Sequence, residues 1–385
     1  MRSDTETVVL LGDYDYDYYR ELSLRDGLRS QGITVLECRF RDEPLSVGLK
    51  KFLLLPLFYV RIWRQMRRLA REESAIDAIL VTKFNISVLP IAALFARRLD
   101  TLLVYDLFVS LYRTADMQDY PRWQVTLIYW LEWLTFRLPD YHLTETAEYA
   151  RLYATLYSLP RSRIVGIPIG ADDTWFHPRE DGGTAFDRFT VVYWGAFLPH
   201  HGVETIVDAA AELAADDIQF VLIGEGVGKD RIERRVAEHG LENVEFWGRA
   251  PWETLGRAAA GADVTMGIFS DDLRAQASIT NKVSEGIASG SAVITMDSPP
   301  IQRWFTHTED IYLVPPEDPT ALAAAIRTLR DDPMLRERIA RGGRTLHETV
   351  FSVDHIGKLL LENVPFSERS PTRRSVVEPT DSKHE

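Results

Sequence analysis

Three polar side chains, Lys282, Glu285 and Ser289, fall at the spacing of neighbours on one face of an α-helix. Lys282 lies in the predicted first turn, where the helix dipole disfavours a cation. A phosphate bound to the N–H groups of that turn would reverse this effect. One turn further on, Glu285 could accept hydrogen bonds from the two hydroxyls of a ribose. The pattern fits a nucleotide, and the alternative is a solvated ion pair on a surface helix.

The local sequence predicts how this helix begins and ends. Ser278 and Thr280 are candidate N-cap residues, and Gly290 follows the helix where a left-handed turn is common. The run at 292–296 (AVITM) is typical of a buried parallel strand. An apolar stripe on the helix, opposite the three polar residues, is formed by Val283, Ile287 and Ala288.

Short apolar runs alternate with helix-like segments along most of the chain. This alternation predicts an α/β fold with parallel sheets and helices on both faces. Ligands of such sheets bind at the carboxyl ends of the strands, which draws attention to Asp106. Strands are predicted at 7–11, 33–37, 77–82, 101–105, 141–144, 190–193, 218–223, 244–247, 263–269, 292–296 and 311–314.

The 385 residues suffice for two domains. A segment rich in Pro, Gly and Asp is expected to link them. We expect an N-terminal domain at 1–170, the linker at 171–188, a C-terminal domain at 189–348, a helix at 349–365 that packs back towards the first domain, and a disordered tail at 366–385.

Charge and cysteine content exclude several classes of protein. There are 57 acidic against 44 basic residues, giving a formal charge of −13, which argues against nonspecific nucleic-acid binding. Cys38 is the single cysteine, so a disulfide within the chain and a Cys-based metal cluster are excluded, and a reducing cytoplasm is expected. Neither a signal peptide nor a membrane-spanning helix is evident.

Two segments have the pattern of membrane-interface helices. In 49–73, four arginines share a face opposite an apolar one: Arg61, Arg64, Arg68 and Arg71. The segment 123–138 carries a belt of Trp and Leu. A basic amphipathic helix with aromatic neighbours can lie at the inner face of a membrane. The alternative is that both are crossover helices packed on a sheet.

A glycine cluster at Gly224 and Gly226 tests two nucleotide-binding motifs. The dinucleotide fingerprint G-x-G-x-x-G needs glycine at 229, where Lys229 stands, and a P-loop needs Ser or Thr after that lysine, where Asp230 stands. An NAD-dependent oxidoreductase is therefore disfavoured. The glycines can still mark a tight turn where backbone approaches a ligand.

The second half of the chain resembles the donor domain of retaining glycosyltransferases of family 4, which have the GT-B fold: two Rossmann-like domains facing each other across a cleft. The resemblance is well supported over about 165–350 and looser before it. It rests on IPIGADDTWFHP (167–178), YWGAFLPHHGVETIVDAA (193–210), FVLIGEGVGKDRIE (220–233), VEFWGRAPWETLGRAAAGADVTMGIFS (244–270), SITNKVSEGIASGSAVIT (278–295) and LVPPEDPTALAAAI (313–326).

The resemblance implies transfer of a sugar from a nucleotide-diphosphate donor, such as a UDP- or GDP-sugar, to a glycan or lipid-linked acceptor, without cofactor or metal. Glu285 matches the residue that holds the donor ribose, and Lys282 matches part of the diphosphate-binding turn. Asp106 lies near the loop that faces the sugar. Catalytic candidates are Asp106, His201, Lys282 and Glu285; donor-binding candidates are Gly195, Gly202, Gly224, Glu225, Arg249, Thr280, Asn281, Lys282 and Glu285.

Three positions depart from the family pattern. Ala277 stands where the family has the first of two glutamates, and Asp271, Asp272 or Arg274 are candidates to replace its contact with the donor sugar. Ala196 and His201 stand where basic residues are usual. If His201 replaces the usual lysine, activity should decline as pH rises through about 6.5. These departures leave open a catalytically inactive GT-B-shaped binding or scaffold protein.

Overall fold

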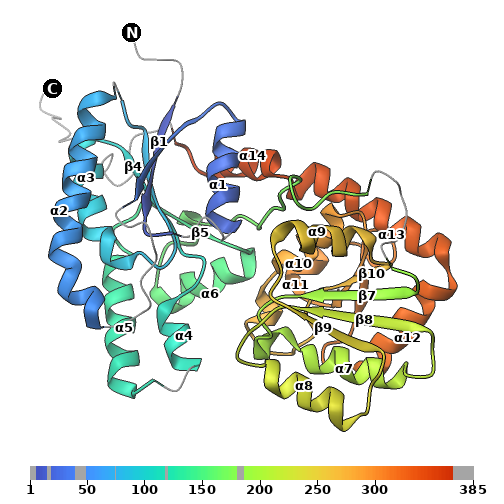
Figure 1. The fold of residues 1–385 in the computed structure, drawn as a ribbon. Coiled ribbons are helices and arrows are strands. Elements are labelled where there is room, and N and C mark those ends of the chain that lie inside the picture. Colours follow the sequence, from blue (N-terminus) through green and yellow to red (C-terminus); the bar gives the residue numbers. More distant parts are fainter. Residues whose placement is uncertain are drawn as a thin grey trace, which may run out of the picture. The chain divides into compact units, whose positions relative to one another are not determined.

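The computed structural model describes two compact units. The described residues are 6–14, 19–39, 49–73, 75–117, 120–179 and 186–366. Those up to Ile167 and from Gly357 onward form the first unit, and Pro168–Ile356 forms the second. Each unit contains a six-stranded parallel sheet, which confirms the predicted α/β class with two Rossmann-like domains (Figure 1).

The sheet of the first unit has the strand order β2-β1-β3-β4-β5-β6. Right-handed crossovers place α1 on one face of this sheet and α2 and α3 on the other face (Figure 1). The elements are β1 (Thr7–Gly12), α1 (Tyr19–Ser30), β2 (Thr34–Arg39), α2 (Leu49–Glu72), β3 (Ala78–Val81), α3 (Leu89–Leu99), β4 (Leu102–Asp106), α4 (Leu111–Met117), α5 (Arg122–Thr135), β5 (Tyr141–Thr144), α6 (Ala147–Tyr157) and β6 (Ile164–Gly166).

The sheet of the second unit has the order β12-β11-β10-β7-β8-β9. Its helices cover both faces, with α7, α8 and α12 on one and α9 and α10 on the other (Figure 1). The elements are β7 (Phe189–Trp194), α7 (Val203–Glu212), β8 (Ile218–Ile223), α8 (Lys229–Glu238), β9 (Val244–Gly248), α9 (Trp252–Gly261), β10 (Val264–Met266), α10 (Asn281–Ala288), β11 (Ala292–Met296), α11 (Pro299–Trp304), β12 (Tyr312–Val314), α12 (Pro319–Asp331) and α13 (Pro333–Leu346).

The strands form because their sequences are apolar on both faces, as parallel strands between helix layers require. All residues of β1, β4 and β11 are buried. In the second unit, Phe220 and Leu222 of β8 pack with α7 and α12, while Val221 and Ile223 point to the opposite face. The sheet thereby separates two apolar layers and presents its polar residues at the strand ends.

The last helix, α14 (Val353–Asn363), carries the chain from the second unit into the first. Gly357 lies directly against α1, because a Cβ at this position would stand 2.0 Å from the carbonyl oxygen of Gly27. No side chain larger than hydrogen fits there, so the sequence permits this close approach only with glycine. The expected helix at 349–365 begins later, since His347–Phe351 forms a π-helical turn.

The segment expected to link the domains differs from that prediction. Ala171 and Phe176 are buried in the second unit, where they pack with Trp194. A backbone bridge also joins Ala171 to Ser352. The residues before 180 therefore belong to the second unit, and the rest of the expected linker up to 185, like the tail after 366, lies outside the described residues.

Two helices of the first unit carry unusual surfaces. On α5, five large apolar side chains of the predicted belt region are exposed, among them Trp123 at 67% and Leu134 at 62%. These side chains are therefore not part of the core, although α5 lies between β4 and β5 in the chain, as a crossover helix does. On α2, Ile62 and Met66 are buried, whereas Arg61 and the other three arginines of its stripe are exposed. The described residues include no helix with both the length and the apolar character needed to cross a bilayer.

Candidate functional site

The strand order of the second sheet reverses between β7 and β10. From β7 the chain moves outward through β8 and β9, and it then returns to β10 on the other side of β7. Loops that leave such a switch point diverge and open a crevice at the carboxyl ends of the strands. Here these are the loops at 195–202 and 267–280, and the second leads into α10.

The first turn of α10 has no side-chain cap. Thr280 occupies the N-cap position, yet its side chain accepts no hydrogen bond from the helix. Thr146 at the start of α6 and Asp318 at the start of α12 do cap their helices. The hydroxyl of Thr280 is buried and lacks a partner among the described residues. The start of α10 therefore retains N–H groups and a hydroxyl that can bind an anion.

Lys282 is a buried cation in this turn. Its side chain is 6% exposed, and neither a hydrogen bond nor an ion pair connects Nζ to the residues that the structure describes. The ammonium lies 5.4 Å from the centre of the Tyr193 ring. Burial lowers its pKa, and Glu285 opposes this change. The alternative of a solvated surface pair is therefore wrong, because both side chains are buried, and a buried charge is costly unless a partner compensates it.

Glu285 is buried one turn further along α10, at 2% exposure. Its Oε2 accepts a hydrogen bond of 2.6 Å from the indole Nε1 of Trp194, and the Asn281 side chain lies beside the carboxylate. Oε1 has no partner of normal geometry in the described part of the chain. Burial raises the pKa of Glu285, while Trp194 and Lys282 lower it. One carboxylate oxygen is thus fixed by the protein, and the other is left for a hydroxyl donor.

Gly195 brings the backbone of the β7 loop against Lys282. A Cβ at Gly195 would lie 2.7 Å from Cε and 2.9 Å from Nζ of Lys282, and its φ of +146° favours glycine. The loop after β7 and the first turn of α10 therefore meet at this residue. The structure thus brings together Gly195, Thr280, Asn281, Lys282 and Glu285, as the sequence-based hypothesis requires.

His201 does not have the environment that its predicted role needs. The side chain is buried, and Nδ1 lies 2.8 Å from the hydroxyl of Tyr193. Burial lowers its pKa far below 6.5, and the neighbouring cation of Lys282 lowers it further. A ring that stays neutral cannot stabilise a diphosphate as a cation. The expectation that His201 substitutes for a lysine is therefore corrected.

The remaining donor-binding candidates occupy turns along the same edge. Gly224 donates from its N–H to the carbonyl of Gly248, which joins the turns after β8 and β9. Glu225 is exposed and forms an ion pair of 2.7 Å with Lys229, and Arg249 is exposed. Gly202 has a different role. It is the N-cap residue of α7, and it packs against the backbone of Ser270.

Asp106 lies in the first unit and is fully buried at the end of β4. Both carboxylate oxygens accept hydrogen bonds from Arg20, the shortest at 3.0 Å. The same guanidinium donates to the carbonyl of Ile167. Nearby, Lys83 pairs with Glu21 at 3.0 Å, and burial lowers the pKa of Lys83 to about 8. These contacts give Asp106 a structural ion pair instead of the sugar contact expected from the sequence.

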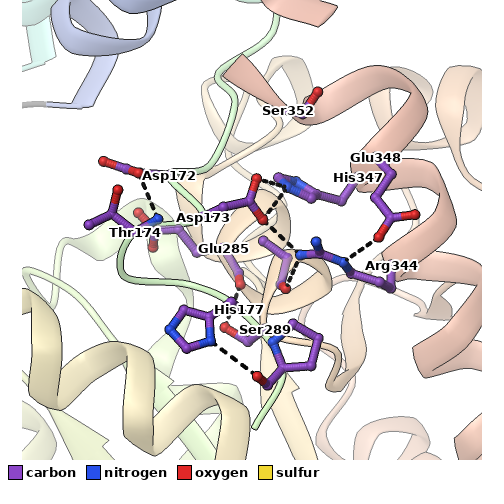
Figure 2. Close-up of polar contacts among 12 residues, drawn as sticks. Asp172, Asp173, Thr174, His177, Glu285, Ser289, Arg344, His347, Glu348 and Ser352 are labelled. Carbon is purple, nitrogen blue, oxygen red and sulfur yellow. Dashed lines mark hydrogen bonds and ion pairs between the residues drawn. The ribbon is translucent and has the colours of Figure 1, made fainter. Parts of the chain in front are cut away.

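The opposite end of α10 is held by a polar network (Figure 2). Arg344 donates a hydrogen bond of 2.7 Å to the carbonyl of Ala288 and one of 2.8 Å to Asp173. Asp173 also lies 3.1 Å from the buried ring of His347, and Arg344 and His347 lower the pKa of its carboxyl. A cation at the C-terminus of a helix complements its dipole. This network fixes the helix that carries Lys282 and Glu285.

The sequence did not identify Trp194 and Tyr193 as part of this site. Trp194 holds Glu285, and Tyr193 holds His201 and covers Lys282. Their place before Gly195, at the end of β7, is a signal that can be recognised once the strand order is known. No group of three or more His, Cys, Asp or Glu side chains suited to a metal ion occurs within the described ranges.

Two domain families together match most of the chain. Residues 178–346 match the family described as glycosyl transferases group 1, and residues 2–170 match the glycosyl transferase 4-like domain. The first match contains the whole α10 site, and the second contains the sheet of the first unit. Each unit therefore resembles a glycosyltransferase domain.

Among curated proteins, the chain is 33% identical over 177 residues to the lipopolysaccharide core biosynthesis glycosyltransferase LpsD of Rhizobium meliloti, covering 45% of this chain and 48% of that protein. It is 29% identical over 243 residues to the D-inositol 3-phosphate glycosyltransferase of Nocardia farcinica, covering 58% and 52%. The matches thus span about half the length of these relatives.

Solved structures share the fold at low identity. Sucrose-phosphate synthase of Thermosynechococcus elongatus has a TM-score of 0.71 at 18% identity, covering 93% of this chain and 98% of that one. HepE of Anabaena, solved in complex with UDP, has a TM-score of 0.68 at 15% identity, covering 93% and 99%. These likenesses confirm the predicted GT-B type of fold.

Proposed function

We propose that this protein is a retaining glycosyltransferase of family 4, which transfers a sugar from a nucleotide-diphosphate donor to a glycan or lipid-linked acceptor. The observation that carries the proposal is the first turn of α10. Among the described residues, the buried ammonium of Lys282 has no hydrogen bond or ion pair, and one oxygen of the Glu285 carboxylate, one helical turn further on, has no partner. A diphosphate supplies the missing anion and a ribose supplies the missing donor. The glycosyltransferase domain matches and the named relatives support a transferase.

The α10 site would act mainly on the departing diphosphate. Cleavage of the bond between sugar and phosphate builds negative charge on the phosphate oxygens. Lys282 and the N–H groups after Thr280 are fixed before the reaction, so they stabilise this charge without a reorganisation cost. Glu285 would hold the ribose and thereby position the phosphates. The binding energy of the nucleotide thus orients the anomeric carbon of the sugar for attack by the acceptor.

Retention of anomeric configuration rests on the family resemblance. The acceptor would attack from the face that the diphosphate leaves, and the chain then needs no enzymic nucleophile. Glu285 is unsuited to that task, because Trp194 engages one of its oxygens and α10 fixes its backbone. Operation without a metal also rests on the resemblance: Lys282 would carry the charge that a metal ion bears in other transferases.

A Glu285→Ala variant tests the donor site. We expect it to weaken binding of UDP, GDP or ADP, whichever binds, by about 1.5–3 kcal/mol, because the ribose loses a charged hydrogen-bond acceptor. Isothermal titration calorimetry measures this change. Glu253→Ala is the matched control, since Glu253 is an exposed glutamate of α9. Equal affinities of the two variants would contradict the ribose assignment.

The alternative is a catalytically inactive scaffold that binds a nucleotide-sugar. The UDP-, GDP- and ADP-sugars distinguish the two functions when a crude acceptor fraction is added to the protein. An enzyme releases nucleoside diphosphate in proportion to acceptor, whereas a binding protein only gains thermal stability. Ala196 and Ala277 are the positions that keep this alternative open.

We also propose that the first unit contacts a membrane surface on the cytoplasmic side, where lipid-linked acceptors are found. The inner face of α5 is fixed by Glu132, whose carboxylate accepts hydrogen bonds from the N–H groups of Leu111 and Tyr112 and from the hydroxyl of Tyr157. The helix cannot rotate its tryptophans inward without losing these bonds. Its exposed face has no acidic side chain, because Glu132 is the only acid of α5 and is buried.

The chemistry of this surface fits a bilayer with anionic lipids. Tryptophan prefers the interface between headgroups and acyl chains, and leucine inserts below it. On α2 of the same unit, four exposed arginines supply positive charge, and Leu57 and Val60 are exposed beside them. Such patches on soluble domains usually mark interaction sites.

A further inference from the structure

The loop that follows β7 lacks a cation for a diphosphate. Its sequence, GAFLPHHG (195–202), contains only two titratable side chains, His200 and His201. Burial holds the pKa of His200 down at about 4, helped by Arg274 and Lys282, and that of His201 is lower still. Both rings are neutral at physiological pH, so neither supplies the charge that the family expects from this loop.

Lys282 alone does not balance a diphosphate. A nucleoside diphosphate carries more than one negative charge at neutral pH. Lys282 provides one positive charge, and the N-terminus of α10 adds about half of one. The site is buried, and an uncompensated charge there is costly. A second cation is therefore required near the start of α10.

Arg274 lies in the loop between β10 and α10, beside the β7 loop. The N–H of Phe269 donates to the carbonyl of His201 at 3.0 Å, which joins the two loops. The backbone at Arg274 is held from both sides: its N–H donates to Asp272 at 2.7 Å, and its carbonyl accepts from Ser278 at 2.9 Å. This loop is thus ordered by its own hydrogen bonds.

The positive charge of Arg274 reaches the same region as that of Lys282. Both cations act on both imidazole rings of the β7 loop, and both lower the pKa of His200 and His201. Two cations from different elements therefore act on the same two rings of the β7 loop. Two polar atoms near Lys282 are buried and have no partner among the described residues: the hydroxyl of Thr280 at the N-cap of α10, and Oε1 of Glu285 one turn after Lys282.

We propose that Arg274 is the second cation of the donor site and binds the phosphate next to the sugar, in place of the basic residue missing from the β7 loop. This inference rests on the proposed donor site at α10. A guanidinium binds phosphate oxygens through two parallel hydrogen bonds, so it also orients the group. Among the three candidates in this loop, the two acids repel a phosphate, and Asp271 already accepts from Gln276.

The test compares nucleoside diphosphates with monophosphates by calorimetry on the full-length protein. We expect Arg274→Ala to weaken binding of the preferred diphosphate by about 10- to 100-fold, the value of a charged hydrogen bond. The monophosphate should lose much less, because it lacks the distal phosphate. Arg274→Lys should recover part of the affinity. Arg303→Ala, at an exposed arginine of α11, is the matched control and should match wild type.

The outcomes separate this inference from the function that it builds on. If Arg274→Ala binds diphosphate as wild type does while Lys282→Ala is weakened, Arg274 has no such role and the donor site stands. If wild type binds no nucleotide, both proposals fail. Equal losses for mono- and diphosphate would also overturn the assignment to the distal phosphate. Should the alanine variant unfold, Arg274→Gln, which keeps a polar side chain, provides the same comparison.

Discussion

At the scale of single residues, the burial of Lys282 and Glu285 decides the chemistry. Each group is desolvated, so the pKa of Lys282 is lowered and that of Glu285 is raised. This cost arises where Lys282 forms no ion pair with a described residue and Trp194 donates to only one oxygen of Glu285. Such unpaired groups are characteristic of binding sites, where the ligand completes the network.

Nucleotide binding should therefore depend on pH through Lys282. Only the charged ammonium attracts the anion. The affinity for the nucleotide is therefore highest below the pKa of Lys282 and falls as pH rises through that pKa. Because burial lowers this pKa below its ordinary value of about 10.4, the loss should begin below that pH and approach tenfold per unit. Calorimetry between pH 7 and 10 measures it, and Lys282→Arg should flatten the curve.

A His201→Gln variant checks the correction at that residue. The lowered pKa of His201 keeps the ring neutral at and above the ordinary histidine pKa of about 6.5, so titrations extended about one pH unit below that value should give the same curve for the variant and wild type. A component of the wild-type curve near pH 6.5 that disappears in the variant would show that His201 is charged in the protein.

Sequence reasoning identified the start of α10 but not the state of its side chains. The spacing of Lys282 and Glu285 fixes their common face, which local sequence can show. Their burial depends on β7 lying next to β10, which is a property of the strand order. The hydrogen bond from Trp194, 91 residues away, and the neutral ring of His201 follow from that adjacency.

At the scale of elements, continuous apolar runs predicted most strands because parallel strands are buried on both faces. The three-residue strand β6 was missed, since it is too short to show a pattern and follows the turn at Arg161–Arg163. The outer face of α5 could not be assigned from sequence either. A stripe of Trp and Leu looks the same whether it faces a sheet or solvent, and here Glu132 fixes it outward.

The apolar face of α5 should bind lipid vesicles. Replacing Trp123, Trp130 and Leu134 by Ser removes three side chains that are more than half exposed, so stability should change little while vesicle binding falls. Co-sedimentation with vesicles containing anionic lipid measures this, and we expect at least about a tenfold loss from removal of that much apolar surface. Met334→Ser, at an exposed apolar residue of α13, is the control. Unchanged binding of the triple variant would contradict the membrane proposal.

At the scale of the whole molecule, the nucleotide groups lie in one unit. Each unit has its own sheet and apolar core, and the residues that we assign to the diphosphate and ribose all belong to the second. A ligand stabilises only those opening reactions that release it. Nucleotide should therefore protect the two units unequally.

Hydrogen exchange can measure this difference. At a nucleoside diphosphate concentration of about 100 times Kd, amides of β7, β10 and α10 should gain up to about 2.7 kcal/mol of protection, while those of β1 and β3 should gain little. The nucleoside without phosphates is the control. Equal gains in both units would show that they open together, contrary to their separate cores.

The helix α14 has a consequence for synthesis on the ribosome. The sheet of the first unit precedes the second unit in the chain, yet Gly357 covers the surface of α1 at Gly27. The ribosome must therefore synthesise the entire second unit before the contact between Gly357 and α1 can form. The second unit can therefore finish folding before the first, which waits, with one side of α1 uncovered, until α14 has emerged.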